Sequence, residues 1–141
     1  MSPMFVPGPV DVAPEVLQQQ TKPMMPHRSK DFEEIFRRSA EKARQVFFTD
    51  ARVFIMTNSG SGAQEAAVRN LAKERVLSCV CGAFSKRWNL VATANGKVTD
   101  KIEVPMGQAI TPEMVEEALQ KENYDLITVV HNETSTGVMN P

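Results

Sequence analysis

Four stretches of the chain have the polar and apolar pattern of helices. Ser29 is a typical N-cap followed by an acidic first turn, and Thr111 precedes a proline that opens another helix. The pattern predicts helices over residues 30–49, 63–73, 84–93 and from 112 onward.

Short apolar runs lie between these helices and are typical of buried strands. They cover residues 52–57, 76–81, 101–104 and 126–130. Because strands and helices alternate with short connections, the chain is predicted to be an α/β protein. We expect a mostly parallel sheet with helices on both faces.

The first 27 residues show no regular spacing and hold six of the nine prolines, which exclude a long helix there. We expect at most a short helix over residues 14–20, with Pro14 at its start. The predicted organisation is therefore an N-terminal arm, residues 1–28, which lies on another surface such as a second subunit. The α/β domain follows over residues 29–141.

Composition narrows the function classes. The 141 residues carry a net charge of −1, which gives no reason to expect a nucleic acid or an anionic membrane as partner. No apolar run approaches the ~18 residues of a membrane span. The first residues show neither a basic segment nor a long apolar one, so we do not expect secretion. Cys79 and Cys81 are interpreted as buried, reduced thiols with no metal site, which favours the cytoplasm.

One loop has the chemistry of an anion site. Asn58-Ser59-Gly60-Ser61-Gly62 stands between a predicted strand and a predicted helix. Glycines let the backbone approach an anion, helix N-terminal amides point at it, and the two serines add hydroxyls. The alternative is an ordinary tight turn with a serine cap. The loop matches neither the P-loop nor the dinucleotide fingerprint, which favours a single phosphate group.

Two further segments follow the second and fourth predicted strands. Residues 82–88 carry Phe84 and Trp88, either of which could stack on a planar ring, and residues 131–137 are rich in hydroxyls and amides. Parallel strands place all three segments at one edge of the sheet, where ligands of α/β proteins bind. The alternatives are a core aromatic residue and a polar loop.

These segments together resemble the class V aminotransferases, which are fold-type-I pyridoxal-phosphate enzymes. The similarity is greatest to the serine–pyruvate and alanine–glyoxylate group. It extends over nearly the whole chain, through four stretches of this sequence: Pro7-Gly8-Pro9, residues 59–67, Gly82-Ala83-Phe84-Ser85-Lys86-Arg87 and Glu133-Thr134-Ser135-Thr136-Gly137.

The resemblance implies a role for particular residues. Phe84 would stack on the pyridine ring, with Trp88 as the alternative, and Thr134 would bond the ring oxygen, with Ser135 as the alternative. Gly8 would approach the substrate. The phosphate of pyridoxal 5'-phosphate would be held by Ser59, Gly60 and Ser61.

The resemblance also implies that catalytic residues are missing. In the family the lysine that forms the Schiff base, and the acid that pairs with the pyridinium nitrogen, lie downstream of Glu-Thr-Ser-Thr-Gly. None of the eight lysines of this chain matches that position. We therefore expect the front part of the large domain, with no catalytic residue in this chain.

The function expected from the resemblance is the cofactor-binding portion of an aminotransferase. Its substrates would be small amino acids and 2-oxo acids, such as alanine or serine with glyoxylate or pyruvate, and the full-length protein would be a homodimer. The alternatives are a class V relative with other chemistry, such as a cysteine desulfurase or an epimerase, and an inactive remnant that only binds.

Overall fold

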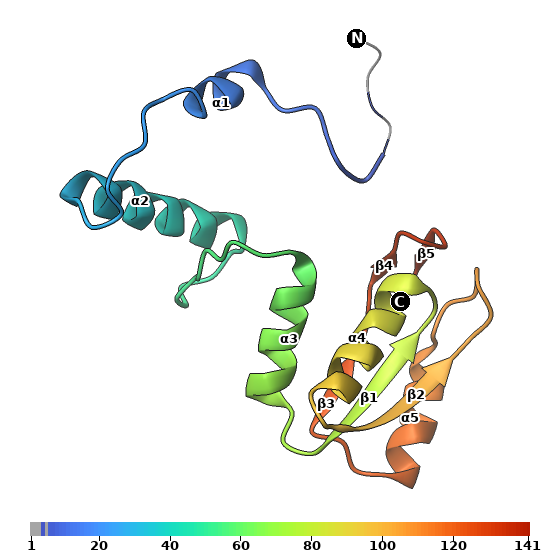
Figure 1. The fold of residues 1–141 in the computed structure, drawn as a ribbon. Helices are drawn as coiled ribbons and strands as arrows, with labels where there is room; N and C mark the ends of the chain where they lie inside the picture. The colour runs from blue at the N-terminus through green and yellow to red at the C-terminus, as the bar shows by residue number, and fades with distance from the viewer. Residues whose placement is uncertain (1–3, 5) are drawn as a thin grey trace. The chain divides into compact units, whose positions relative to one another are not determined.

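The computed structural model describes residue 4 and residues 6–141 (Figure 1). Two compact units follow one another along the chain, the first up to Thr57 and the second from Asn58 to Pro141. Each unit is described by itself. Within the described residues, no helix is both long enough and apolar enough to cross a membrane.

The first unit is helical. A short helix, α1 (Pro14–Gln19), starts with proline as expected, and the longer α2 spans Lys30–Val46. The Ser29 hydroxyl accepts a hydrogen bond from the Phe32 amide at 3.2 Å, which confirms the predicted N-cap. Helix α2 ends earlier than predicted because Phe48 adopts a left-handed conformation, with φ of 50°.

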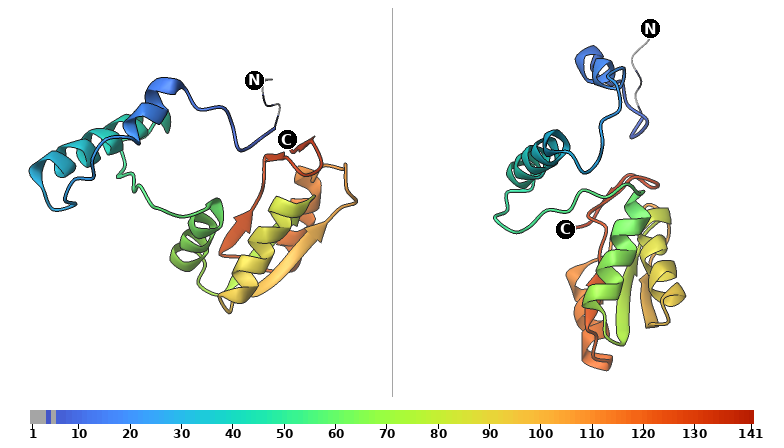
Figure 2. Two further views of the ribbon diagram at one scale, coloured as in Figure 1. Left: turned by 45° about the horizontal axis from the view of Figure 1, so that its top comes forward. Right: turned by 60° about the vertical axis from the view of Figure 1, so that its left-hand side comes forward.

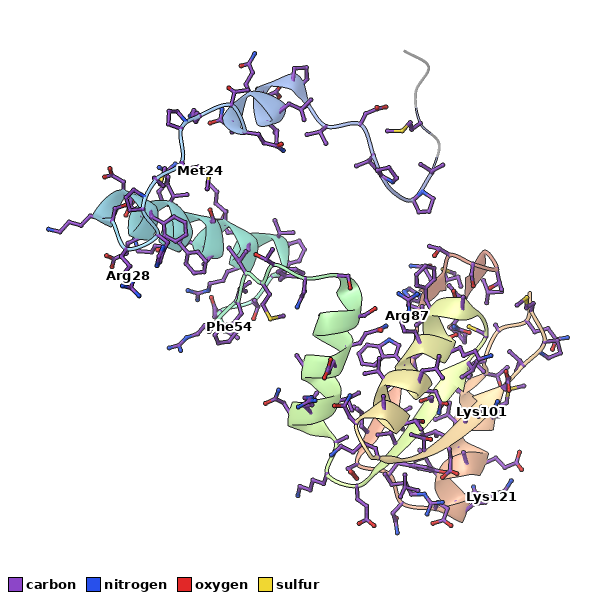
Figure 3. The ribbon with its side chains drawn as sticks, viewed as in Figure 1. Met24, Arg28, Phe54, Arg87, Lys101 and Lys121 are labelled. Carbon is purple, nitrogen blue, oxygen red and sulfur yellow. The ribbon has the colours of Figure 1, made fainter. Side chains whose placement is uncertain are left out.

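The strand predicted over residues 52–57 is wrong. This segment has no strand structure, and Phe54 within it is 72% exposed (Figure 3). A strand exists only when its backbone groups pair with a neighbour, and no described strand pairs with this segment. An apolar sequence alone therefore does not form a strand here.

The second unit contains the sheet. Its strands β1 (Arg75–Val80), β2 (Val98–Glu103) and β3 (Leu126–Thr128) lie in the order β2-β1-β3. Both pairings are parallel, which confirms the predicted sheet type. The helices are α3 (Gly60–Leu71), α4 (Ala83–Ala94) and α5 (Pro112–Lys121), and a small antiparallel hairpin follows, formed by β4 (Asn132–Glu133) and β5 (Val138–Met139).

Helices cover both faces of the sheet, as the sequence predicts (Figure 2). Side chains of a strand alternate between its faces, and β1 divides accordingly. Val76 is fully buried in a cluster with residues of α3 and α4. Cys79 packs instead with Ile110 and Val115 on the side of α5. The central strand thus joins two small apolar cores.

The amino ends of the strands are joined by charged groups. The Asp125 carboxylate accepts hydrogen bonds from the amides of Glu74 and Arg75. The Arg75 guanidinium in turn pairs with Asp100 at 2.8 Å and with Glu122 at 3.0 Å. These contacts fix the amino end of the sheet, whereas residues 82–88 and 131–137 of the predicted site follow the carboxyl ends of β1 and β3.

Shortening one core side chain tests this arrangement. The Val76→Ala variant should lower the free energy of unfolding by about 2 kcal/mol, because it removes two buried methyl groups and leaves a cavity. Val98→Ala on the neighbouring strand β2 is the control, since Val98 is 49% exposed, and should change stability by less than about 0.5 kcal/mol. Urea unfolding measures both, and equal losses would contradict the assigned core.

Candidate functional site

Two helices of the second unit begin near the carboxyl edge of the sheet. Helix α4 follows β1 directly, and α3 precedes β1 and packs beside α4 (Figure 1). Helix α3 begins at Gly60 rather than at the predicted Ala63, so the predicted phosphate loop forms the first turn of the helix. The N-termini of the two helices differ in how their free amides are satisfied.

The N-terminus of α3 is open. The first amides of a helix have no intrahelical acceptor, and a capping side chain usually satisfies them. Here Ser59 occupies the N-cap position without a side-chain capping bond, and the first turn holds no acidic residue. A Cβ atom built on Gly60 would meet no heavy atom within 4 Å. An anion can therefore approach these amides directly.

The turn before α3 is tightly packed on its other side. The Gly62 amide donates to the Ser59 carbonyl oxygen at 2.9 Å. A Cβ atom on Gly62 would lie 2.7 Å from Cγ of Asn58, so a larger residue would displace that side chain. The two glycines thus have different uses, since Gly62 shapes the turn and Gly60 leaves space outside it.

The N-terminus of α4, in contrast, is closed by the carboxylate of Glu133, which is 1% exposed. One carboxylate oxygen, Oε2, accepts from the Ser85 amide and from the Ser85 hydroxyl, both at 2.8 Å. The other, Oε1, accepts from the Phe84 amide at 3.3 Å. A side chain of this chain itself therefore occupies the position that an external anion could take.

Ser135 completes the contacts of that carboxylate. Its hydroxyl donates to Oε1 of Glu133 at 2.6 Å, and its amide donates to the same oxygen at 3.3 Å. The hydroxyl oxygen also accepts from the Ala83 amide at 2.9 Å. The first three amides of α4 are thus all bonded to the hairpin segment.

Gly82 makes this close approach possible. A Cβ atom at this position would lie 2.5 Å from Cγ of Glu133 and 2.5 Å from Oγ of Ser135. Such distances are far inside van der Waals contact, so any larger residue would push the hairpin away from α4. Packing therefore requires a glycine at position 82.

Hydrogen bonding dominates the ionisation of Glu133. Burial of the carboxyl group acts to raise its pKa, but the hydrogen bonds from Ser135 and Ser85 outweigh this effect and lower the pKa to about 2. The side chain is therefore an anion at neutral pH, as its set of donors requires. Its negative charge lies at the positive end of the α4 dipole.

Phe84 and Trp88 lie in different surroundings. Trp88 packs against the cluster of Val68 and Ala92 between the helices and the sheet. Phe84, one turn earlier on α4, is 42% exposed. Its partly free ring can accept a planar ligand, which favours Phe84 over the alternative Trp88 as the stacking residue.

Arg87 connects α4 with the open end of α3 (Figure 3). Its guanidinium donates to the Ser61 hydroxyl at 3.2 Å and lies 5.6 Å from the centroid of the Phe84 ring. Within the described residues Arg87 forms no ion pair, whereas Arg69 and Arg75 of the same unit do. Arg87 is not among the predicted site residues, although it stands at the end of the motif that begins at Gly82.

The two candidate hydroxyls after β3, those of Thr134 and Ser135, differ in their hydrogen bonds. Ser135 uses its hydroxyl on Glu133 and on the Ala83 amide. Thr134 is exposed and forms no hydrogen bond with any described residue. Of these two residues, Thr134 is the one with a hydroxyl available for a ligand, which favours it over the alternative Ser135.

Asn140 is a second buried polar residue at this edge, 2% exposed. Its Oδ1 accepts from the Ile110 amide at 2.7 Å, and its Nδ2 donates to the Val130 carbonyl oxygen at 2.6 Å. It thereby ties the end of the hairpin to the segment before α5. No signal in a single sequence marks Asn140 or Glu133, because their partners lie far away along the chain.

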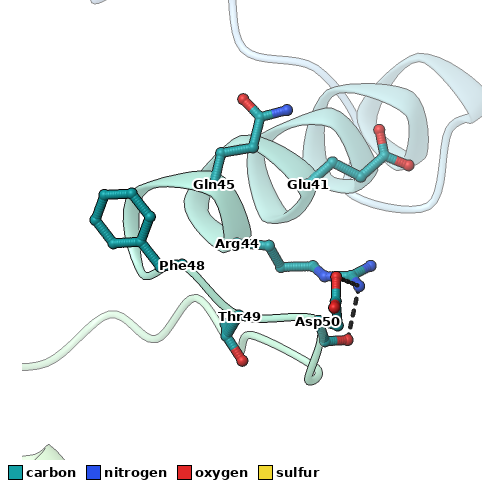
Figure 4. Close-up of a pocket in the computed structure, with 6 residues that line it drawn as sticks. All are labelled: Glu41, Arg44, Gln45, Phe48, Thr49 and Asp50. Atoms are coloured by element: carbon teal, nitrogen blue, oxygen red, sulfur yellow. Dashed lines mark hydrogen bonds and ion pairs between the residues drawn. The ribbon is translucent and has the colours of Figure 1, made fainter.

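The first unit contains a hollow that is lined by none of the predicted site residues. A hollow of about 590 Å³ lies at the C-terminal end of α2 in the first unit, lined by Glu41, Arg44, Gln45, Phe48, Thr49 and Asp50 (Figure 4). Its arginine already donates to the Asp50 main-chain oxygen at 2.6 Å.

No described group of His, Cys, Asp or Glu could hold a metal ion. Cys79 and Cys81 are buried free thiols, and burial, with Cys81 nearby, raises the pKa of Cys79 to about 11.

The second unit thus brings most of the predicted site residues into one region. Ser61 and Phe84 both contact Arg87, and Thr134 lies beside the residue that caps α4. Gly8 belongs to the first unit, so its approach to the substrate stays a prediction. These groups suit a phosphate ester joined to a planar ring. The α3 amides and the Arg87 guanidinium could bind the phosphate, and the exposed Phe84 side chain could stack on the ring.

Comparison with known proteins agrees with this geometry. Residues 14–141 match the family model described as aminotransferase class-V. An uncharacterized aminotransferase of Methanocaldococcus jannaschii is 39% identical over 142 residues, which cover 98% of this chain and 37% of the relative. A serine–glyoxylate aminotransferase of Methylorubrum extorquens is 36% identical over 141 residues, covering 96% of this chain and 35% of the relative.

A solved structure supports the fold. An aspartate aminotransferase of subgroup IV from Thermus thermophilus superposes with a TM-score of 0.84 at 38% identity, covering 95% of this chain and 38% of that one. The chain belongs to the class V aminotransferase family, whose fold is the fold-type-I α/β architecture and whose cofactor is pyridoxal phosphate. It spans little more than a third of the length of the relatives it matches.

Adding one methyl group tests the packing at α4. The Gly82→Ala variant should lower the free energy of unfolding by about 1–3 kcal/mol, because the new Cβ atom overlaps Glu133 and Ser135. The same change at Gly60 is the control and should be neutral, since that Cβ atom meets nothing within 4 Å. Thermal or urea unfolding compares the two, and a neutral Gly82→Ala would contradict the described contact.

The charge of Glu133 should make the free energy of unfolding depend on pH in the acid range. A carboxyl group with a lowered folded-state pKa stabilises the protein above its unfolded pKa of 4.5, and this stabilisation is lost as the pH falls toward about 2. Glu133→Gln should therefore be less stable than the wild type at pH 7 by about 1–3 kcal/mol.

The difference between the two proteins should shrink between pH 4.5 and 2, as measured by urea unfolding. Glu116→Gln on the exposed surface of α5 is the matched control. A difference that stays constant down to pH 2.5 would show that Glu133 is not ionised in the folded protein.

Proposed function

We propose that this chain is the cofactor-binding portion of a pyridoxal-phosphate aminotransferase that acts on small amino acids and 2-oxo acids. One observation carries the proposal: the N-terminus of α3 is open, while the adjacent N-terminus of α4 is filled by Glu133. Of these two helix ends, that of α3 is the one an anionic ligand can occupy, and the exposed Phe84 ring lies on the neighbouring helix α4. The family membership supplies the identity of that ligand.

Each part of the cofactor has candidate contacts. The Gly60 and Ser61 amides, with the hydroxyls of Ser59 and Ser61, would hold the phosphate. Phe84 would stack on the ring, and Thr134 would donate to or accept from the ring oxygen. Pyridoxal phosphate, when bound, supplies an electron sink for charge that develops on the substrate.

Arg87 adds charge to the phosphate site. A guanidinium near the positive end of a helix dipole is unfavourable unless an anion lies between or beside them. Here the cation lies against Ser61 in the first turn of α3 and has no carboxylate partner among the described residues. A phosphate group would relieve this repulsion and accept hydrogen bonds from both elements.

We propose that residues outside this chain supply the covalent chemistry. The reaction needs a lysine that binds the cofactor and an acid beside the ring nitrogen. Lys86 is the nearest lysine in sequence to Phe84, and it is exposed on α4. We propose that the 141 residues position one side of the cofactor and that transamination belongs to a longer protein.

The substrates are proposed from the relatives. The relative in Methylorubrum extorquens is a serine–glyoxylate aminotransferase, and another in Paracoccus denitrificans is an L-aspartate–glyoxylate aminotransferase. A small 2-oxo acid is therefore the proposed acceptor. We further propose that the full-length protein is a homodimer in the cytoplasm, where buried thiols such as Cys79 stay reduced.

Binding of the cofactor tests this proposal. Pyridoxal phosphate should quench the fluorescence of Trp88, the single tryptophan, because the proposed ring site lies one helical turn away. Inorganic phosphate should compete with this binding. Borohydride reduction should leave no stoichiometric label on a single lysine, and a stable label confined to one lysine would contradict the assignment of the catalytic lysine to a longer protein.

A negative charge introduced at Gly60 tests whether the cofactor phosphate binds at α3. Gly60→Asp puts a carboxylate in the first turn of α3, where no atom lies within 4 Å, and should weaken pyridoxal-phosphate binding about tenfold by repulsion. Gly60→Asn has the same shape without the charge and should weaken it much less. Equal affinities of these two variants would exclude α3 as the phosphate site.

A further inference from the structure

We propose that Glu133 is a positioning residue for cofactor-ring recognition, because its hydrogen bonds to α4 and to Ser135 hold Phe84 and Thr134 in one arrangement. The inference rests on the function proposed above and deepens it. It separates the recognition of the ring, which depends on Glu133, from the recognition of the phosphate, which depends on α3.

The carboxylate fixes the turn that carries Phe84. It accepts from the Phe84 amide at 3.3 Å and from the Ser85 amide at 2.8 Å. The Ser85 hydroxyl donates to the carboxylate and accepts from the Gly82 amide at 3.0 Å. The backbone position from which the Phe84 ring extends is therefore determined by a side chain that lies 49 residues further along the chain.

The same carboxylate also fixes Thr134. This residue stands between Glu133, which is 1% exposed, and Ser135, whose amide and hydroxyl both donate to Oε1 of Glu133. Because its two neighbours are tied to α4, Thr134 is left exposed with a free hydroxyl. One buried anion thus sets the two predicted ring contacts relative to each other.

The phosphate contacts do not share this dependence. Within the described part of the chain, Glu133 forms no hydrogen bond with α3, and in the first turn of α3 the Gly62 amide donates to the Ser59 carbonyl oxygen. Loss of the Glu133 charge should therefore move the ring contacts and leave the α3 amides in place. Glutamine keeps the shape of the side chain, but its amide group would face N–H donors of α4 and repel them.

Three probes divide the two contributions in the 141-residue chain. Inorganic phosphate reports the anion site, pyridoxine reports the ring, and pyridoxine 5'-phosphate carries both without an aldehyde that could react with lysine. In the wild type, pyridoxine 5'-phosphate should bind roughly three- to tenfold more tightly than inorganic phosphate, from the stacking contribution. Amide NMR shifts at Ser61 and Phe84 measure the two sites separately.

Glu133→Gln should bind inorganic phosphate with unchanged affinity and lose the three- to tenfold preference for pyridoxine 5'-phosphate. Glu116→Gln, the same change on the exposed face of α5, should keep that preference. Ser135→Ala removes one donor to the carboxylate and the contact with Ala83, and it should lose part of the preference.

The outcomes separate this inference from the proposed function. A wild type that binds neither phosphate probe would overturn the proposed function and this inference with it. Wild-type binding with an undiminished preference in Glu133→Gln would overturn the inference alone. The inference would also be overturned if Glu133→Gln lost affinity for inorganic phosphate and for pyridoxine 5'-phosphate equally while its amide NMR spectrum stayed that of a folded protein. Should that variant unfold, an undiminished preference in Ser135→Ala would overturn the positioning role.

Discussion

The buried carboxylate of Glu133 is the contact on which the carboxyl edge of this sheet depends. An ion is costly to remove from water unless hydrogen bonds replace its hydration, and this one receives bonds from the amides and hydroxyls of Ser85 and Ser135 and from the amide of Phe84. The helix dipole of α4 adds a favourable field. The hairpin β4–β5 and the start of α4 are therefore held together by charge rather than by apolar packing.

This internal anion also supports α3 as the proposed site of an external one. Two neighbouring helix N-termini would each attract a phosphate, but α4 is already satisfied by Glu133. Helix α3 has neither an acid in its first turn nor a capping bond from Ser59, and Arg87 adds a positive charge beside it. Selectivity between the two sites therefore follows from electrostatics.

The sequence predicted the elements better than their connections. Helices and parallel strands follow from local spacing, and Ser29 and Pro14 mark helix starts correctly. The strand over residues 52–57 failed because strand formation depends on a partner, which spacing does not report. Phe84 and Thr134 could be selected from their motifs, whereas Glu133 could not be recognised as the cap of α4, because its partners are 48 and 49 residues away.

The position of Glu133 immediately before Thr134 has a mechanical consequence. A protein hydroxyl on a flexible loop would sample many positions. Ordering that loop on ligand binding would cost conformational entropy. Here the residues on both sides of Thr134 are bonded to α4, the helix that also carries Phe84. The distance between Phe84 and Thr134, the two proposed ring contacts, is thus fixed before any ligand arrives. Gly82 is the residue that permits this, since any side chain there would separate the hairpin from the helix.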